Sequence, residues 1–331
     1  MGLITGLFLF IGGLQVMSKG LKEAASYSVK QGLRRLAGNP LMGLMVGTAA
    51  AVVLQSSSIT TVMVVGLVNS ELITLKQGIS MIVGANIGTT VTAQVIAFPL
   101  HEWAVPAAVL GLIFLLLSRI KSKSIFRLGK ILLGGSFLFI GLNLMSSSLS
   151  PLRESTWIIP LLIEAGEVPF KGILMGAVTT FFFQSSSAVI AIIMAMAQRG
   201  IVSLPAGIAI ILGADMGTCI TSMIASVGTN LNARRAALAH LIFNVIGAFC
   251  MLPFFHYFTH IVMETSSYMP RQIANAHTFY NIFNAIIIIP FINFFTRFII
   301  FLMPGRKEGE IRPTFFFNKG KGHNFKKLSD K

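Results

Sequence analysis

The chain has 331 residues, of which 54% are hydrophobic and only 11% are charged, a balance that excludes an ordinary soluble domain and indicates the lipid bilayer as solvent. Its formal net charge of +15 does not predict nucleic-acid binding, because the basic residues lie between long apolar runs and not together on one folded surface. The two cysteines, Cys219 and Cys250, lie in apolar segments and have neither the number nor the spacing of a disulfide framework or a zinc site.

Several apolar runs are long enough to cross the membrane, so the sequence predicts an all-α membrane protein. A helix needs roughly 20 residues to span the hydrocarbon core. The first run, Leu3 to Val16, lacks the basic start and the small-residue cleavage site of a secretory signal, and it is expected to be a membrane helix. The crossings are expected over residues 3–18, 77–98, 100–118, 126–148, 203–227, 236–258 and 274–303, the last with a kink at Pro290.

Two stretches outside these crossings are basic. Residues 19–36 contain five basic residues and one acid, Glu23, with apolar residues between them, a pattern typical of an amphipathic helix at the membrane interface. Residues 305–331 are polar, basic and rich in glycine and lysine, and they are expected to form a flexible cytoplasmic tail after the membrane domain.

Two further regions each hold a polar centre between two short apolar arms. Neither arm can span the membrane alone, so each region is predicted to be a re-entrant helical hairpin whose tip stops partway across. Non-helical backbone at that depth is tolerated only inside protein or beside a watery cavity. The arms are Leu41–Leu54 and Ile59–Val68 around Gln55-Ser56-Ser57-Ser58, and Gly172–Phe183 and Ala188–Ala197 around Gln184-Ser185-Ser186-Ser187.

The two polar centres belong to an internal repeat. Gln55 and Gln184 are 129 positions apart (184 − 55), and the same offset relates several glycines, such as Gly84 and Gly213. Similarity at one fixed offset indicates a duplication. The predicted domains are a first membrane repeat over residues 3–118, a second over 126–258, an additional C-terminal membrane helix over 271–303 and the tail over 305–331.

Loop charges predict the orientation of the repeats. The linkers at 19–36, 119–130 and 234–235 and the tail are basic, which places them in the cytoplasm, with the N-terminus outside and Arg199 as a mild exception. Each repeat then has three crossings, an odd number, so the second repeat is inverted relative to the first. Inverted repeats with interrupted helices around a midplane site are typical of secondary transporters, which work by alternating access, here in the cell membrane.

The hairpin tips carry the groups of an anion site. Each tip offers an amide, three hydroxyls and the N-terminus of the following half-helix, whose unpaired N–H groups and positive dipole end favour a negative ligand. Because no basic residue lies deep in a span, a co-bound cation is expected to help electrostatically. The alternative is that the hydroxyls only bond neighbouring helices, but their recurrence after glutamine in both repeats favours the site.

A second pair of motifs supplies candidate ligands for that cation. Gly84–Thr90 and Gly213–Cys219 each place two glycines around a polar residue within an apolar helix, and local unwinding is expected there, so that each repeat contains a broken helix. Asp215 is the only acid in the middle of a predicted span, and intramembrane carboxylates are usually functional. The alternative is a buried, hydrogen-bonded Asp215 without a ligand. The candidate sodium ligands are Asn86, Thr89, Asp215 and Thr218.

The similar segments Ala239–Asn244 and Ala276–Asn281 each contain one histidine and end in asparagine. Interhelical hydrogen bonds are the expected role of these polar side chains, and ligand binding or a proton relay is the alternative. The residues concerned are His240, Asn244, His277 and Asn281, with Asn284 close by.

These motifs resemble those of the type II sodium-dependent phosphate cotransporters and their bacterial relatives. The resemblance covers most of residues 3–290 and is carried by the paired Gln-Ser-Ser-Ser motifs with Gly-Ala-Asn-Ile-Gly-Thr-Thr downstream. It implies a sodium-coupled phosphate symporter with sodium as coupling ion and no other cofactor. It implies phosphate binding by Gln55, Ser56, Ser57, Ser58, Gln184, Ser185, Ser186 and Ser187. It implies sodium binding by Gln55, Ser58, Asn86, Thr89, Gln184, Ser187, Asp215 and Thr218.

Two other functions stay open on the sequence. A secondary transporter of another oxyanion would share the fold and most of the site, and an anion channel is the more distant alternative. An enzyme is not expected, because both hairpins lack histidine and no Ser-His-Asp set is evident. The expected partners are inorganic phosphate, sodium and the bilayer, and a homo-oligomer is left open.

Overall fold

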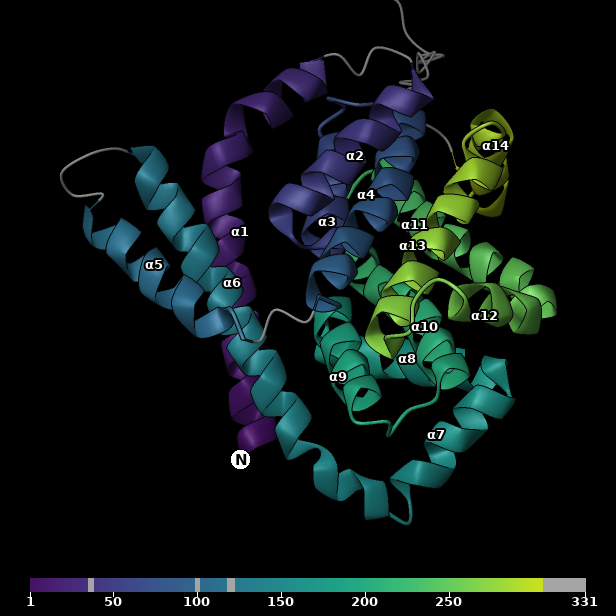
Figure 1. Ribbon diagram of the computed structural model, residues 1–331. Coiled ribbons are helices and arrows are strands. Elements are labelled where there is room, and N and C mark those ends of the chain that lie inside the picture. The colour runs from purple at the N-terminus through teal and green to yellow at the C-terminus, as the bar shows by residue number, and fades with distance from the viewer. Residues whose placement is uncertain (35–38, 99–101, 118–122, 306–331) are drawn as a thin grey trace, which may run out of the picture.

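The computed structural model describes residues 1–34, 39–98, 102–117 and 123–305, and every regular element in these ranges is helical (Figure 1). Apart from Gly305, the predicted tail lies outside the described residues. The helices are α1 (Gly2–Arg34), α2 (Pro40–Leu54), α3 (Ser57–Asn69), α4 (Leu75–Ile96), α5 (Ala104–Leu117), α6 (Lys123–Ser148), η1 (Ser150–Glu154), α7 (Ile158–Glu167), α8 (Pro169–Phe183), α9 (Ser186–Gln198), α10 (Leu204–Ala225), α11 (Leu231–Met251), η2 (Leu252–Phe254), α12 (Phe255–Met263), α13 (Met269–Ile288) and α14 (Ile292–Leu302).

Five of these helices are long and apolar enough to cross a membrane, and the bent pair α13–α14 makes a sixth candidate span. The two members of that pair meet at 86° across Ile289 to Phe291, which confirms the predicted kink at Pro290. The predicted crossing at 100–118 appears as α5, which has only 14 described residues. The part of the chain that the structure describes therefore fits a multi-pass membrane protein.

The first helix is longer than predicted. Residues 19–34 do not form a separate amphipathic helix, because α1 continues without a break from Gly2 to Arg34; residues 35 and 36 of the predicted segment lie outside the described ranges. Nothing in this stretch breaks a helix at the point where the basic residues begin: the segment holds no proline, and Gly20 packs closely against α6. The separate interface helix was thus a wrong prediction.

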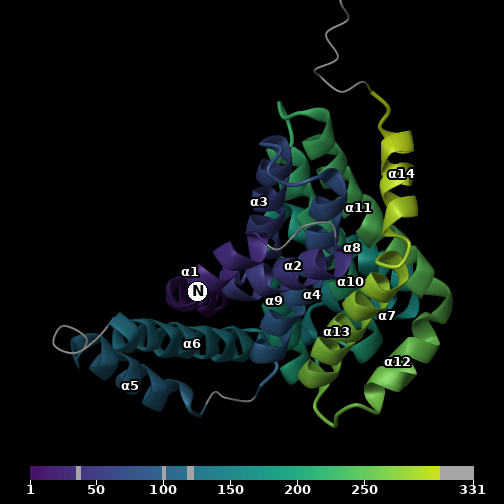
Figure 2. The same cartoon turned by 90° about the horizontal axis from the view of Figure 1, so that it is seen from above.

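Helices α1 and α6 pack against each other in antiparallel directions, with α5 on the outer side of α6 (Figures 1 and 2). A Cβ on Gly6 would lie 2.7 Å from the Gly141 carbonyl oxygen, and one on Gly13 would lie 2.6 Å from that of Gly134. Such backbone contact is available only to glycine, and small residues at the interface are how membrane helices approach closely. The three helices form an arm beside the remaining bundle.

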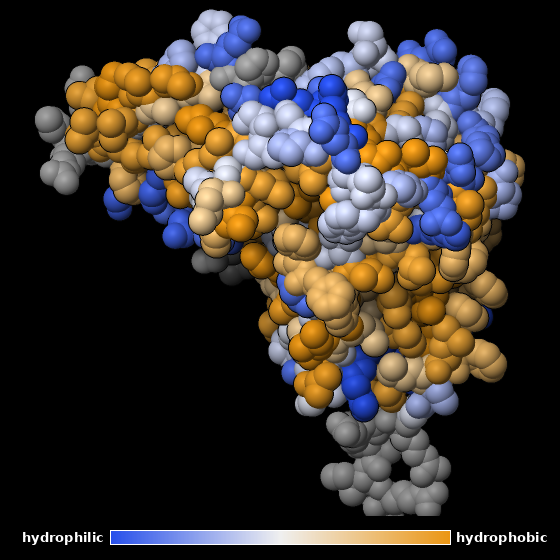
Figure 3. All heavy atoms as spheres, turned by 90° about the horizontal axis from the view of Figure 1, so that it is seen from below, coloured by the Kyte–Doolittle hydropathy of each residue, from blue (hydrophilic) through white to orange (hydrophobic). Residues whose placement is uncertain are grey.

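Much of the arm's surface is apolar on the face that Figure 3 shows. On α5 the large side chains stand exposed along most of the helix, and such a continuous apolar surface in water would be an aggregation liability. In a bilayer the same surface costs nothing, since lipid tails are equally apolar. The exposed residues on α5 are Val105, Val109, Leu110, Leu112, Ile113, Leu116 and Leu117.

Each predicted hairpin region contains two short helices that meet at the polar centre. Gln55 ends α2 in the left-handed conformation, with φ of 52°, and Gln184 ends α8 in the same way, with φ of 54°. The next residue in each case is extended and caps the following helix: the Ser56 hydroxyl accepts from the Ile59 N–H and the Ser185 hydroxyl from the Ala188 N–H. Serine is a favoured N-cap, so the sequence itself dictates where these helices break.

The predicted unwinding of the two glycine motifs is wrong. Helices α4 and α10 are continuous through Gly84–Thr90 and Gly213–Cys219. The glycines serve close packing instead, α4 against α2 and α10 against α8: a Cβ on Gly84 would lie 2.0 Å from the Leu44 carbonyl oxygen, and one on Gly213 would lie 1.9 Å from that of Ile173. Glycines four positions apart leave the helix intact and let a neighbouring backbone approach.

This packing predicts a large difference between two Gly→Ala variants. Gly176→Ala is expected to destabilise the protein by about 1–3 kcal/mol, because the new methyl group overpacks the interface, lying 1.9 Å from the Ile210 carbonyl oxygen. Gly66→Ala is the matched control, since a Cβ there meets nothing within 4 Å and alanine favours a helix. Thermal unfolding of the purified variants in detergent measures the difference; equal melting temperatures would contradict the close approach of α8 and α10.

Candidate functional site

The two serine-rich tips line one cavity of about 460 Å³, although they lie in different halves of the chain. Helix α1 forms the facing wall, with an apolar part from Phe10 to Leu14 and a polar part from Gln15 to Lys22. The tip residues that line the cavity are Gln55, Ser56, Ser185 and Ser187, and the wall residues on α1 are Phe10, Ile11, Leu14, Gln15, Ser18, Lys19 and Lys22.

The first tip is held by hydrogen bonds from three directions. The buried Gln55 side chain donates from Nε2 to the Val52 carbonyl oxygen, 2.7 Å away, and accepts at Oε1 from the Thr92 hydroxyl of α4, 2.9 Å away. The Ser18 hydroxyl of α1 donates to the carbonyl oxygen of Leu54 at 2.9 Å. These bonds fix the tip relative to α1 and α4, so the cavity wall and the tip form one polar unit.

Two lysines of α1 give the cavity its positive charge. Lys22 is half-buried and Lys19 is exposed, and both line the cavity. The sequence interpretation missed them, because it assigned residues 19–36 to a separate interface helix. Extending the helical period of α1 past Ser18 would have found them: Lys19 and Lys22 are three positions apart, and Lys22 and Ser18 are four apart, so all three share one face.

The other four residues of the two motifs do not line the cavity. Ser57 and Ser186 are buried at the starts of α3 and α9, and Ser58 is half-buried one position further on. Gln184 is exposed, and its Nε2 donates to the Phe181 carbonyl oxygen at 3.0 Å. The two tips therefore differ, since the glutamine faces the cavity in the first repeat only.

Asp215 lies in a buried cluster that joins α10 to α13. His277 Nε2 is 3.0 Å from both carboxylate oxygens, and Asn281 Nδ2 donates to Oδ2 at 2.8 Å. The Thr218 hydroxyl donates to the Asp215 carbonyl oxygen at 2.6 Å. Within the described part of the chain, Asn281 Oδ1 is buried without a hydrogen-bond partner. His277 Nδ1 is likewise buried without a partner among the described residues, and a buried polar atom that lacks a hydrogen bond costs free energy.

Asn86, the repeat counterpart of Asp215, lies in a similar cluster that joins α4 to α11. Its Nδ2 donates to Asn244 Oδ1 at 2.8 Å, and its Oδ1 is 3.3 Å from His240 Nε2. The Thr89 hydroxyl donates to the Ala85 carbonyl oxygen at 3.0 Å. The expected interhelical bonds of His240, Asn244, His277 and Asn281 are thus confirmed, whereas the same expectation is wrong for the buried Asn284, whose two amide atoms have no hydrogen-bond partner among the described residues.

The two clusters are in contact with each other. Asn244 Nδ2 donates to Cys219 Sγ at 3.3 Å, and the Tyr280 hydroxyl donates to the Asn244 carbonyl oxygen, also at 3.3 Å. None of Asn86, Thr89, Asp215 or Thr218 lines the cavity at the tips. The link to the cavity is Thr92, which lies one turn beyond Thr89 on α4 and bonds Gln55.

Several known proteins are similar to this chain in sequence. The sequence profile described as Na+/Pi-cotransporter matches residues 9–147 and 158–265. The uncharacterized protein YqeW of Bacillus subtilis is 32% identical over 263 residues, 79% of this chain and 85% of that protein. The putative inorganic phosphate export protein YjbB of Salmonella typhimurium is 26% identical over 266 residues, 80% of this chain and 48% of YjbB. The human sodium-dependent phosphate transport protein 2B is 35% identical over 97 residues, 29% of this chain and 14% of that protein.

The matches cover different shares of the relatives. The chain spans about half the length of the YjbB proteins it matches, and no solved structure matches it. The family profile nevertheless covers most of the chain, including both Gln-Ser-Ser-Ser tips, α4 and α10. The chain therefore belongs to the Na+/Pi-cotransporter family, a family of phosphate transporters and not of enzymes.

Proposed function

We propose that the protein is a symporter that couples inorganic phosphate to sodium and binds phosphate between its two Gln-Ser-Ser-Ser tips. The observation that carries the proposal is the single cavity lined by Gln55 and Ser56 from one repeat and by Ser185 and Ser187 from the other. Helices α3 and α9 begin at these tips, and their positive dipole ends favour an anion. Lys19 and Lys22 add full charges to the same cavity.

Phosphate in this cavity would be bound by the tip side chains, by the N-terminal ends of α3 and α9 and by the lysines of α1. The lining hydroxyls and the Gln55 amide form directed bonds, and hydrogen bonds to a charged ligand are worth more than those to a neutral one. The buried Ser57 and Ser186, with Ser58 and Gln184, complete the proposed set in a state of the transporter in which the tips have moved. Alternating access requires such movement of one repeat against the other.

Sodium is proposed to bind at the buried clusters of α4 and α10 and at the tips. Asp215 supplies the charge, and Asn86, Thr89 and Thr218 supply neutral oxygens, with Gln55, Ser58, Gln184 and Ser187 at the tips. The Gln55–Thr92 bond connects the tip to α4 and offers a path by which a cation near Asn86 or Thr89 stabilises the tip. The repeats are proposed to be inverted, and the antiparallel α1 and α6, which are related by the repeat, support this.

Reconstitution tests the proposal directly. Purified protein in liposomes is expected to accumulate labelled phosphate when sodium is high outside, and to lose this uptake when sodium is replaced by potassium. Sulfate in excess is expected not to compete. Saturable uptake without sodium dependence would contradict coupling, and unsaturable flux would indicate a channel.

Export is the second candidate direction of transport, because YjbB of Salmonella typhimurium is named a putative inorganic phosphate export protein. The same cavity serves either direction, since the gradients decide which way a symporter runs. Cells that overproduce the protein distinguish the two: uptake predicts a rise in cellular phosphate in sodium medium, and export predicts a fall.

The proposed topology has its own test. Cysteines at Lys123 and Glu164, in a chain whose exposed Cys250 is replaced by serine, are expected to react with a membrane-impermeant thiol reagent from opposite sides. Helix α6 separates the two positions and has 26 residues, about 39 Å at 1.5 Å per residue, enough to cross the roughly 30 Å core. Labelling of both cysteines from one side would contradict the inverted arrangement.

A further inference from the structure

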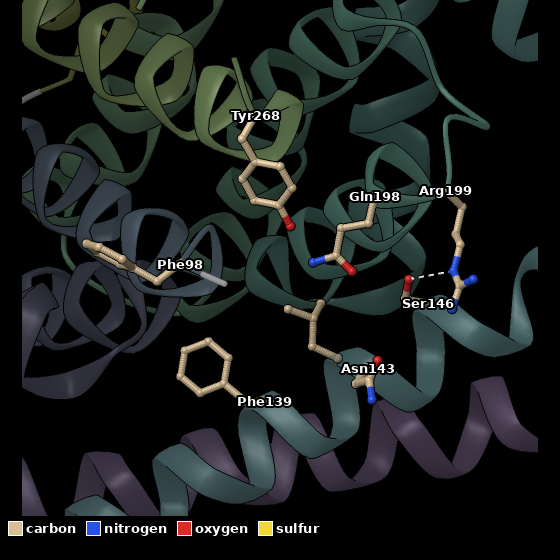
Figure 4. Close-up of a pocket in the computed structure, with 8 residues that line it drawn as sticks. Phe98, Phe139, Asn143, Ser146, Gln198, Arg199 and Tyr268 are labelled. Carbon is tan, nitrogen blue, oxygen red and sulfur yellow. Dashed lines mark hydrogen bonds between the residues drawn. The ribbon is translucent and has the colours of Figure 1, made fainter. Parts of the chain in front are cut away.

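A second polar pocket lies at the other end of α9 from the serine tip (Figure 4). It has a volume of about 250 Å³, well above the roughly 10–15 Å³ that a cavity needs to hold one water. Gln198 and Arg199 enter it from the end of α9, Asn143 and Ser146 from α6, and Tyr268 from the start of α13. The apolar part of its lining consists of Phe98, Phe139 and Leu142.

The polar side chains of this pocket are held in place. The Arg199 guanidinium donates from Nε to the Ser146 hydroxyl at 3.1 Å, which uses one of its five N–H donors. Tyr268 points toward Gln198 in Figure 4. A guanidinium anchored through Nε keeps its outer nitrogens available for an oxyanion, which it prefers to bind in a bidentate way.

Two further arginines contact residues that line the pocket. Arg153 donates to the Arg199 carbonyl oxygen, and the Arg271 guanidinium lies over the Phe98 ring, 4.3 Å from its centre. No acidic side chain among the described residues lines the pocket. One arginine, Arg199, therefore lines a space of this size with no carboxylate among the lining residues, and such a positive charge attracts anions.

The repeat relates this pocket to the cavity at the tips. Phe10 and Leu14 of α1 line the cavity, and Phe139 and Asn143 of α6 line the pocket. Phe139 is 129 positions after Phe10, and Asn143 is 129 positions after Leu14, the same offset that separates the two glutamines. Gln198 lies 11 positions beyond Ser187 on α9, about 17 Å along the helix axis. The tip cavity and the pocket thus lie at opposite ends of α9, and repeat-related residues of α1 and α6 line them.

We propose that the pocket around Arg199 binds inorganic phosphate, as the vestibule through which the anion reaches or leaves the tips on the side of the membrane where α9 ends. The cavity with Lys19 and Lys22 remains the proposed binding site between the tips. The pocket and the cavity lie along the route of one anion, and the positive charge of Arg199 raises the local phosphate concentration at the end of that route nearest the pocket. This inference rests on the proposed phosphate transport.

Kinetics from each face test the vestibule. Arg199→Gln is expected to raise the phosphate concentration for half-maximal transport at least about tenfold from the side where α9 ends, since a lost charged hydrogen bond has an effect of this size, and to leave the value from the other side unchanged. Lys22→Gln, in the cavity that is proposed to bind phosphate between the tips, is expected to raise the value from both sides. Arg199→Lys, which keeps the charge, recovers part of the loss, and Arg234→Gln, on an exposed arginine of α11, is the control. Whole cells and inverted membrane vesicles present the two faces.

Equilibrium binding separates this inference from the proposed function. Purified Ser187→Ala protein is expected to retain one class of bound labelled phosphate, which Arg199→Gln removes and Tyr268→Phe weakens. That result supports the pocket even if sodium-coupled transport is not observed. The proposal would be overturned if Arg199→Gln changed the half-maximal phosphate concentration equally from both faces, or if it left phosphate binding unchanged. It would also be overturned if the effect appeared only with phosphatidylglycerol in the vesicles, because the occupant would then be a lipid headgroup.

Discussion

Replacing Ser187 with alanine is expected to raise the phosphate concentration for half-maximal uptake by about ten- to a hundredfold. Ser187 lines the cavity at the tip of the second hairpin, and a lost hydrogen bond to a charged ligand is worth about 1.5–3 kcal/mol, which corresponds to this range. The helix itself is spared, because the cap of α9 is Ser185 and not Ser187. Initial rates of labelled phosphate uptake at saturating sodium, over a range of phosphate concentrations, measure the change.

Ser147→Ala is the control for this experiment. Ser147 is exposed on α6, and its hydroxyl donates to the Leu144 carbonyl oxygen of its own helix, so the same deletion removes no group from the cavity. Its kinetics are expected to match the unmodified protein. If Ser187→Ala also matches it, then phosphate does not bind where the two tips meet.

The sequence predicts the helix breaks well because their cause is local. A glutamine that ends one helix and a serine that caps the next are consequences of backbone preferences that can be read without knowing the rest of the fold. The kink at Pro290 has the same origin. The repeat then shows that two such breaks exist, and the shared cavity between them is what the structure adds.

The wrong predictions concern features that depend on neighbouring helices. Two glycines in a membrane helix are compatible with local unwinding or with close helix packing. Only the structure, in which α2 lies against α4 and α8 against α10, shows that these glycines serve close packing. The partners of Asp215 could not be chosen from the sequence either, because His277 is 62 positions away and another histidine of similar context, His240, bonds Asn86 instead. The position of Lys22, in contrast, could have been predicted from the helical period of α1. It was missed because the composition changes at residue 19, where a separate helix was expected to begin.

Asp215→Asn is expected to raise the sodium concentration for half-maximal phosphate uptake at least about tenfold. The carboxylate is buried, and its repeat counterpart is the neutral Asn86, so the pair of clusters is asymmetric in charge and a cation should prefer the Asp215 side. Attraction between a carboxylate and a cation at 4 Å amounts to about 4 kcal/mol at an effective dielectric of 20, more than a tenfold change requires. Asparagine keeps the shape and one acceptor oxygen for His277 or Asn281, so the fold is expected to survive.

Sodium activation at fixed phosphate, in proteoliposomes of equal protein density, measures this effect. Glu264→Gln makes the same chemical change at an exposed site after α12, and its curve is expected to superimpose on that of the unmodified protein. The phosphate concentration for half-maximal uptake at saturating sodium is expected to stay unchanged in Asp215→Asn, because the tips are intact and the bound cation is restored by mass action. If the sodium curve of Asp215→Asn also superimposes, then the carboxylate only joins α10 to α13, and the sodium ligands are to be sought among the oxygens of the tips.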